Sequence, residues 1–330
     1  MSKEPAQYAL AVDIGGTKMD IAFIDQFGNL LEPAVRHLVP FGKDGAADPE
    51  KMLDMLAPYV NRAKRELENF RGIGLSICGN IDIDTGDAVL VANLRWYNLP
   101  FGKMALERFN VPNFPATDVR MALLAEVLWG NAQGLRHVAW MTLGTGYGGY
   151  LFLNGKLYGG MHGFAGNLGH NIYDERIGDK CGCGQKGCFE SFVSGPAIAR
   201  QGQLVLDQRN SEVLWKLSKY GAEPVTTRMV FEAEAAGDLK SQEIIAEVVR
   251  KLGISFASMV NLLDLEMIVL GGGVWKGSPD FVERVDRRVR AFLMTEEAKC
   301  DLRIVKESFE NSALVGAAAE VFIRTGVLHF

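Results

Sequence analysis

The sequence predicts an α/β protein built from two domains. Apolar runs typical of strands alternate with segments of helical periodicity. The length of 330 residues exceeds the size at which one core keeps growing, so two domains of about 120–200 residues are expected. An apolar strand also meets a glycine-rich turn three times, at Gly15, Gly144 and Gly271. This recurrence suggests a duplicated phosphate-binding architecture.

The composition excludes several classes of protein. Apolar residues make up 48% of the chain and charged residues 23%, which is ordinary for a globular protein. The formal charge of −5 argues against a nucleic-acid surface. No segment has the run of about 20 apolar residues that a membrane span needs. The first residues have no apolar signal core, so with clustered cysteines the expected location is cytoplasmic.

The first elements are a hairpin and a helix. Tyr8–Val12 and Met19–Ile24 read as strands joined by a Gly-Gly turn. Asp48 is placed to cap a helix whose first residue is proline. Leu53, Leu56, Val60 and Leu67 form the apolar face of this helix. Pro58 is expected to kink or divide it.

The remaining elements follow from apolar periodicity and glycine stops. The expected strands are Gly72–Ile77, Ala88–Ala92, His137–Leu143, Gly149–Leu153 and Leu265–Leu270. The expected helices are Val119–Trp129, Ser241–Leu263, Asp280–Leu293 and Asn311–Ile323.

A candidate metal site is formed by His170, Cys181, Cys183 and Cys188. Three thiolates and one imidazole are a standard tetrahedral zinc set. The glycines between the cysteines allow the tight turns that would bring the sulfurs together. The alternative is free thiols or a disulfide, although cysteines separated by one residue are poorly placed to bridge each other. The isolated Cys78 and Cys300 are expected to be buried apolar side chains.

The three glycine turns admit two interpretations. Successive backbone N–H groups in such turns bind phosphate, whereas any one turn alone could be only a tight hairpin. Three such turns in one chain favour a nucleotide-binding site. The run Gly144–Gly149 resembles a dinucleotide fingerprint, but a strand rather than a helix is expected to follow it. No acidic residue lies about 20 positions on, near Phe164, so a dehydrogenase is disfavoured.

Two aspartates carry the candidate chemistry. Asp118 is either an N-cap for the following helix or a general base, since phosphoryl transfer needs one positioned carboxylate to orient an attacking hydroxyl. Asp13 is either a turn residue or a carboxylate near a nucleotide-bound Mg²⁺. Their combination with the glycine turns favours the functional reading of both.

Two motifs carry a family resemblance. They are Asp13-Ile14-Gly15-Gly16-Thr17-Lys18, and Gly169-His170 followed by Cys181-x-Cys183-Gly-x-x-Gly-Cys188-x-Glu190. With them the whole chain resembles the ROK family (repressor, open reading frame, kinase) of bacterial sugar kinases. The resemblance implies a two-domain actin-like ATPase (ribonuclease H-like) fold with a cleft between lobes. The expected lobes are residues 1–115 with 311–330, and residues 116–310, which carry the zinc site.

The resemblance also implies roles for named residues. Asp118 would be the base that acts on a sugar hydroxyl, with ATP and Mg²⁺ as cofactors and zinc as a structural ion. Asp13, Gly15, Gly16, Thr17, Lys18, Gly144, Thr145 and Gly146 would lie around the phosphates, and Gly271, Gly272 and Gly273 near the adenosine. Asn93, His170 and Glu190 would contact the sugar, with Thr117 and Asn167 in the same pocket. Members of the family are often dimers, so a homodimer is expected.

Four positions depart from the family pattern. Thr117 and Arg120 replace asparagines, Asn167 replaces a glutamate, and Cys78 stands where proline is usual. Because sites that hydrogen-bond hydroxyls reject analogues strongly, several changes at once suggest an altered substrate.

The sequence therefore predicts an ATP-dependent kinase for a hydroxyl, the 6-OH, of a hexose or related sugar such as glucose, N-acetylmannosamine, fructose or an amino sugar. The alternative is a catalytically inactive regulator or sensor of the same family. Regulators of the family carry an added N-terminal helix-turn-helix, for which the segment before Tyr8 is too short.

Overall fold

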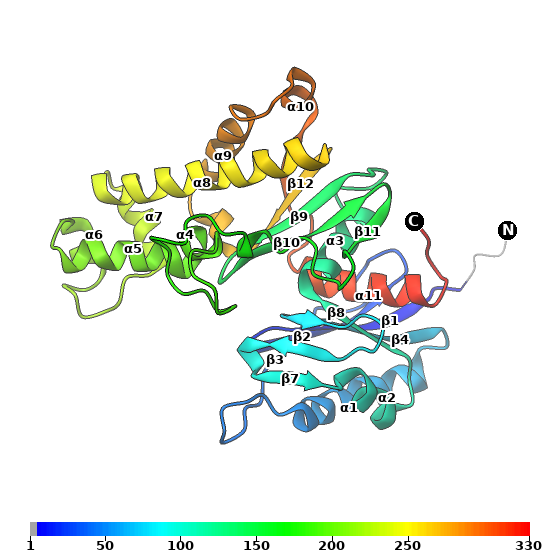
Figure 1. The fold of residues 1–330 in the computed structure, drawn as a ribbon. Helices are drawn as coiled ribbons and strands as arrows, with labels where there is room; N and C mark the ends of the chain where they lie inside the picture. Colours follow the sequence, from blue (N-terminus) through cyan, green and yellow to red (C-terminus); the bar gives the residue numbers. More distant parts are fainter. Residues whose placement is uncertain (1–4) are drawn as a thin grey trace. The chain divides into compact units, whose positions relative to one another are not determined.

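The computed structural model describes residues 5–330, and the chain divides into two compact units. The first unit holds residues 5–135, Gly155–Ala165 and Glu307–Phe330. The second unit holds Arg136–Asn154 and Gly166–Lys306. The predicted α/β class is confirmed (Figure 1). Residues 116–135 lie with the first unit, which differs from the expected lobes because the helix they contain packs on the last helix of the chain.

The first unit contains two sheets and four helices among the described residues. Its main strands are β1 (Tyr8–Ile14), β2 (Lys18–Asp25), β3 (Val35–Leu38), β4 (Phe70–Ile77) and β8 (Asn113–Thr117). The second sheet has the order β5 (Asn80–Ile81), β6 (Ala88–Val91) and β7 (Trp96–Leu99), and the short strand β11 (Lys156–Tyr158) belongs to neither sheet. Its helices are α1 (Pro49–Glu66), α2 (Phe101–Phe109), α3 (Asp118–Trp129) and α11 (Ser312–Arg324), with a 3-10 turn at Ala92–Leu94.

The main sheet of this unit brings three strand ends to one edge. Its order is β3-β2-β1-β4-β8. The pairs β1–β2 and β2–β3 are antiparallel, which confirms the predicted hairpin. The pairs β1–β4 and β4–β8 are parallel. The carboxyl ends of β1, β4 and β8 therefore lie side by side, and the segments that follow them can share a site.

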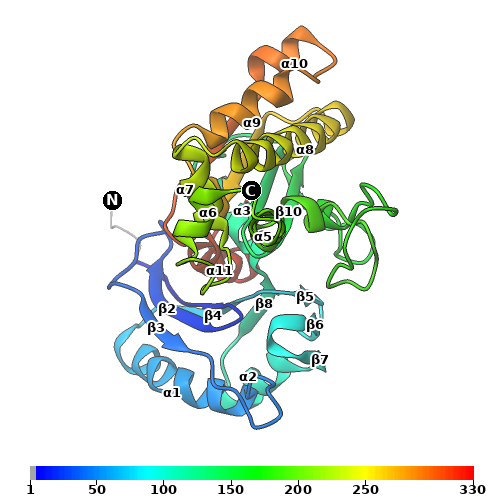
Figure 2. The same cartoon turned by 90° about the vertical axis from the view of Figure 1, so that its left-hand side faces the viewer.

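The two faces of β1 pack against different helices. Leu10, Val12 and Ile14 join the core that also contains the buried face of α1. Ala9 and Ala11 point the other way and pack with α11, which lies across this face of the sheet (Figures 1 and 2). The small side chains permit a close approach. A Cβ added at Gly74 would lie 1.9 Å from the carbonyl oxygen of Ala317.

Helix α1 begins as predicted and continues further than expected. The carboxylate of Asp48 accepts a hydrogen bond from the Lys51 N–H at 3.1 Å, and Pro49 is the first helical residue. The expectation that Pro58 divides the helix is wrong, because α1 runs without interruption to Glu66. Pro58 is exposed, while buried side chains before and after it anchor both halves of the helix to the core.

The second unit is built around a smaller sheet and a long helix. Its strands are β9 (Val138–Leu143), β10 (Tyr147–Leu153), β12 (Met267–Gly271) and β13 (Arg303–Lys306). Its helices are α4 (Glu190–Val193), α5 (Gly195–Asp207), α6 (Glu212–Leu217), α7 (Thr227–Ala235), α8 (Leu239–Leu263), α9 (Phe281–Arg290) and α10 (Glu296–Asp301). Two 3-10 turns occupy Leu168–His170 and Gly273–Lys276.

The strands of this unit pair in the order β10-β9-β12-β13. Strands β9 and β10 form an antiparallel hairpin, and β12 is parallel to both β9 and β13. The carboxyl ends of β9 and β12 therefore meet at one edge, where the second and third glycine turns begin. A strand follows the Gly144 turn, as predicted, so the helix that a dinucleotide fingerprint requires is not there. Within residues 5–330 no helix is both long and apolar enough to cross a membrane.

Candidate functional site

Asp13 lies near the end of β1 and is held by two neighbours. The hydroxyl of Ser76 donates to its Oδ1 at 2.6 Å, and the amide of Asn311 donates to its Oδ2 at 3.1 Å. Asn311 also donates to Asp20, whose carboxylate receives two hydrogen bonds from Arg36 at 2.7 and 2.8 Å. Burial raises the pKa of Asp13, while the bonds from Ser76 and Asn311 oppose that rise. Asp13 is thus an oriented carboxylate within a strand rather than a turn residue.

Asp118 is the first residue of α3, directly after β8. Its Oδ1 accepts hydrogen bonds from the Val119 N–H at 2.9 Å and the Thr117 hydroxyl at 3.2 Å. Thr117 occupies the N-cap position, so the interpretation of Asp118 as an N-cap is wrong. Burial, followed by the nearby Asp13 carboxylate, raises the pKa of Asp118 to about 6. A carboxylate with this pKa is suited to accept a proton near neutral pH.

Cys78 and Asn93 lie at the same sheet edge as the two aspartates. The Cys78 thiol is hydrogen-bonded to Asn93, and burial together with Asp118 and Asp13 raises the pKa of Cys78 to about 12. A Cβ added at Gly16 would lie 3.0 Å from the Cβ of Asn93. The first glycine turn, a neutral thiol, an amide and two carboxylates therefore share this edge of the first unit.

Arg120, one of the departures from the family pattern, is paired inside the first unit. One of its guanidinium nitrogens donates to both carboxylate oxygens of Glu320, at 3.0 and 2.8 Å. Glu320 belongs to α11, so this ion pair joins α11 to the first turn of α3. Asp118 lies in that same turn.

The second and third glycine turns line one cavity in the second unit. The Gly144 N–H donates to the Gly146 carbonyl at 2.9 Å, and the Gly195 N–H donates to the Gly144 carbonyl at 2.8 Å. Gly272 has a φ of +97°, and a Cβ there would lie 2.5 Å from the Leu143 carbonyl oxygen. Only glycine fits this position, so the third turn is held closely against the end of β9.

This cavity has a volume of about 810 Å³. Its walls come from the two glycine turns, the start of α5 and the start of α7; the lining residues are Gly144, Thr145, Gly195, Pro196, Ala199, Val225, Thr226, Thr227, Arg228, Phe231, Glu232, Gly273, Val274, Lys276 and Gly277. Both its volume and its mixture of apolar walls with backbone N–H groups suit a nucleotide. Gly271 and Gly272 stand beside it in the chain but do not line it.

The four predicted metal ligands converge. The ligand atoms of His170, Cys181, Cys183 and Cys188 all lie within 4.8 Å of one another. The His170 Nδ1 and Cys181 Sγ are 3.6 Å apart, and the Cys183 and Cys188 sulfurs are 3.5 Å apart. Tetrahedral zinc with bonds of about 2.0–2.3 Å places its ligands about 3.5–3.8 Å apart. All the cysteines are free, so the donor set and spacing fit zinc and not a disulfide.

The backbone around this cluster depends on glycine at two positions. Gly184 has a φ of +92° and its N–H donates to the Cys181 carbonyl at 2.9 Å, which closes the turn between the first cysteines and the third. Gly187 has a φ of +79°, and a Cβ there would lie 2.3 Å from the Asp174 carbonyl oxygen. The turns that the sequence predicted from its glycines are therefore formed.

Glu190 connects the metal cluster to the second glycine turn. Its Oε2 accepts the Tyr147 N–H at 2.9 Å, and its Oε1 lies 3.5 Å from the Cys181 sulfur. A Cβ added at Gly146 would lie 2.7 Å from the same carboxylate. His170 and Asn167 are exposed near the start of this segment. The predicted sugar contacts of the second unit thus stand in one stretch of chain beside the glycine turn.

The sequence analysis did not predict some residues of the site, and its expectation for one cysteine was wrong. Ser76 and Asn311 orient Asp13, and the start of α5 forms part of the cavity; neither was expected. The Ser194-Gly195-Pro196 helix start was a readable signal for the latter. Cys78 is half-buried against the core, but the expectation for Cys300 is wrong because Cys300 is exposed on α10.

The chain is similar to known proteins over nearly its whole length. The ROK family model matches residues 9–323. A glucokinase of Halalkalibacterium halodurans is 29% identical over 295 residues, which cover 88% of each chain. A xylose repressor of Caldicellulosiruptor bescii is 28% identical over 230 residues, 68% of this chain and 56% of the repressor. A Streptomyces griseus ROK glucokinase, solved with glucose and AMPPNP, has a TM-score of 0.77 and 26% identity, covering 94% of this chain and 98% of that one.

Proposed function

The chain belongs to the ROK family, and on that premise we propose that it is an ATP-dependent kinase for a hexose or hexose-like sugar. Its fold is the actin-like ATPase fold of the ROK kinases. The observation that carries the proposal is the Asp118 carboxylate, whose pKa is raised to about 6 at the edge where three parallel strands end. The similarity to glucokinases and the nucleotide-sized cavity support it.

In this function the cavity of the second unit holds ATP. The turn residues Gly144 and Thr145, together with Gly273, would face phosphates or ribose, and the apolar walls would cover the adenine. Asp13, with Gly15, Gly16, Thr17 and Lys18 after it, would serve the phosphate and Mg²⁺ side. Mg²⁺ commonly takes one or two carboxylates together with phosphates and waters, and it neutralises the charge that develops on the phosphate oxygens.

Asp118 would act as the general base. Its Oδ atom takes the proton of the sugar hydroxyl while the hydroxyl oxygen forms a bond to the γ-phosphorus. The bond between that phosphorus and the β,γ-bridging oxygen breaks, and ADP leaves with the electron pair. The hydrogen bonds from Val119 and Thr117 hold Asp118 in one orientation, which is the main contribution such a base can make.

Five side chains would contact the sugar. Asn93 and Thr117 in the first unit, and Asn167, His170 and Glu190 in the second, offer donors and acceptors for hydroxyls. Because Asn167 and Thr117 differ from the family pattern, we infer an acceptor other than plain glucose, with the 6-hydroxyl as the position phosphorylated. The zinc bound by His170 and the three cysteines would be structural and would fix the imidazole that faces the sugar.

A coupled assay of ADP release against a panel of hexoses, amino sugars and polyols tests the proposal. The expected result is sugar-dependent ADP release with at least one acceptor and its loss in Asp118→Asn. A specific observation favours the alternative, since the chain also matches a xylose repressor. If a sugar raises the melting temperature but no sugar releases ADP, the chain is a sensor or regulator and the kinase proposal fails. The expected homodimer stays a prediction, which light scattering can test.

A further inference from the structure

The segment that carries the metal ligands, residues 166–189, has little regular structure of its own. Apart from one 3-10 turn, its described pairing consists of two isolated bridges, Ile172 with Cys188 and Lys180 with Lys186. One of its contacts with the rest of the second unit is made by the ring of Tyr173, which packs on Phe192 of α4. Tyr173 packs edge-on against Phe189 and Phe192, with ring centroids 5.4 and 5.1 Å apart. Tyr173 and Phe189 belong to the segment and Phe192 belongs to α4, so these rings join the metal-bearing segment to α4.

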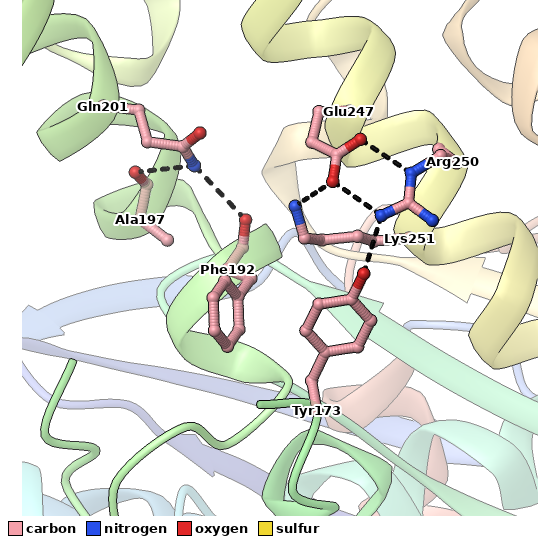
Figure 3. A network of polar contacts seen from close by, with 7 residues as sticks. All are labelled: Tyr173, Phe192, Ala197, Gln201, Glu247, Arg250 and Lys251. Carbon is pink, nitrogen blue, oxygen red and sulfur yellow. Dashed lines mark hydrogen bonds and ion pairs between the residues drawn. The ribbon is translucent and has the colours of Figure 1, made fainter. Parts of the chain in front are cut away.

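One face of helix α8 contacts two of these rings, those of Tyr173 and Phe192 (Figure 3). Glu247, Arg250 and Lys251 are three and four residues apart, so they project from the same side of the helix. Glu247 accepts hydrogen bonds from Arg250 at 2.7 Å and from Lys251 at 2.6 Å. Arg250 then donates to the hydroxyl of Tyr173 at 2.6 Å.

Lys251 is the buried member of this group. Its side chain is 9% exposed, and its ammonium lies 5.5 Å from the ring centroids of both Tyr173 and Phe192. A buried ammonium is costly unless it is paired, and here the Glu247 carboxylate and two ring faces compensate it. The ion pair with Glu247 and the two ring contacts together hold Lys251 in one position, and Lys251 in turn holds the two rings against α8.

The two rings flank the groups assigned to the sugar. Tyr173 follows His170 by three residues, and Phe192 follows Glu190 by two. The Tyr173 N–H also donates to the Gly187 carbonyl at 2.8 Å, next to the ligand Cys188. A shift of either ring would therefore move a metal ligand and a proposed sugar contact together.

We propose that Lys251, supported by Glu247 and Arg250, is a positioning residue that holds His170 and Glu190 in place for sugar binding by clamping the metal-bearing segment to α8. The proposal rests on the proposed function for its sugar consequence. Its mechanical part, the hold on the zinc segment, can be measured without turnover. Lys251 touches neither nucleotide nor sugar in this role.

The test compares Lys251→Met, Lys251→Arg and Lys240→Met with the wild type, all loaded with zinc. Lys240 is the matched control, because it lies on the same helix and pairs with Glu243 at 2.7 Å, but its side chain is 44% exposed. In Lys251→Met, zinc release to a chromogenic chelator is expected to quicken about tenfold, and the KM for sugar to rise about tenfold. Its kcat and its KM for ATP are expected to stay within about twofold. Lys251→Arg keeps the positive charge and the ring contact, so its zinc release and its KM for sugar are expected to stay close to the wild-type values.

Unchanged zinc release in Lys251→Met, or an equal rise of the KM values for sugar and ATP, overturns the proposal. A fall in melting temperature alone, with zinc release and the sugar KM as in wild type, overturns it as well. If the wild type phosphorylates no sugar, the proposed function has failed. The positioning role of Lys251 is then tested by zinc release and by the thermal stabilisation that sugar produces. In that case a sensor whose sugar affinity falls in Lys251→Met but not in Lys240→Met supports it.

Discussion

Arg120 and Glu320 form a buried ion pair between α3 and α11. Their side chains are 12% and 1% exposed, and residues 200 positions apart in the sequence meet there. The sequence placed Arg120 among the changes expected to alter the sugar pocket. Its guanidinium instead binds Glu320, so this change has a structural role in holding the helix that begins with Asp118.

Arg120→Met is expected to lower the free energy of unfolding by about 3–5 kcal/mol, because it leaves the Glu320 carboxylate buried without its partner. Urea denaturation of the variant against wild type measures this. The double variant Arg120→Met with Glu320→Met removes both charges and should recover most of the loss. A single variant that costs less than about 1 kcal/mol would show that the pair is solvated.

Asp118→Asn is expected to reduce kcat about 10³-fold or more while leaving the affinity for ATP within about threefold, because only proton acceptance is lost. In the wild type, kcat/KM for the sugar should rise with pH through about 6, since the base must be ionised and its pKa is raised to about 6. Asp84→Asn, an exposed carboxylate outside the candidate site, serves as control. A flat profile between pH 5 and 8 would remove Asp118 from this role.

The same substitution is expected to stabilise the protein at neutral pH. The pKa of Asp118 is raised in the folded state, so folding favours the protonated carboxyl and stability falls as pH rises from about 4 to 6. Asparagine avoids the buried charge, which predicts a gain of about 1–3 kcal/mol at pH 7 and almost none at pH 4. Denaturation curves at the two pH values check this. An equal effect at both would mean that the charge is not the cause.

Removal of zinc should loosen the second unit. Cys183→Ser, or chelation of the wild type, is expected to release one equivalent of zinc and lower the melting temperature by about 5 °C or more. Cys300→Ser is the control, because Cys300 is an exposed thiol outside the cluster. Metal analysis and calorimetry measure both quantities. Retention of zinc by Cys183→Ser would require a different ligand set.

Filling the cavity tests the nucleotide assignment. Ala199 on α5 lines the cavity, so Ala199→Trp is expected to raise the KM for ATP about tenfold or more with little change in melting temperature. Leu204→Trp on the same helix is the control, because Leu204 is exposed and does not line the cavity. An unchanged KM for ATP in Ala199→Trp would place the nucleotide elsewhere.

Features that depend on neighbouring residues were predictable from the sequence. The Asp48-Pro49 helix start, the hairpin around Gly15 and the closely spaced cysteines of the metal cluster are examples. Contacts between distant residues were not predictable. Nothing near Asp13 indicates that Asn311, 298 positions away, donates to it. Pro58 was misjudged because packing on both sides of an exposed proline outweighs its local effect on the helix.

The position of α11 has a consequence for the order in which the polypeptide acquires structure during synthesis. Residues 136–306 fall almost wholly in one unit, so the ribosome has delivered that unit's strands and long helix before α11 emerges. Ala9 and Ala11, translated about 300 codons earlier, meet the α11 side chains of their core cluster only when Ser312–Arg324 appears. Until then the alanine face of the early sheet lacks the cover of α11, so chaperones can bind it, and a chain that terminates early leaves it exposed.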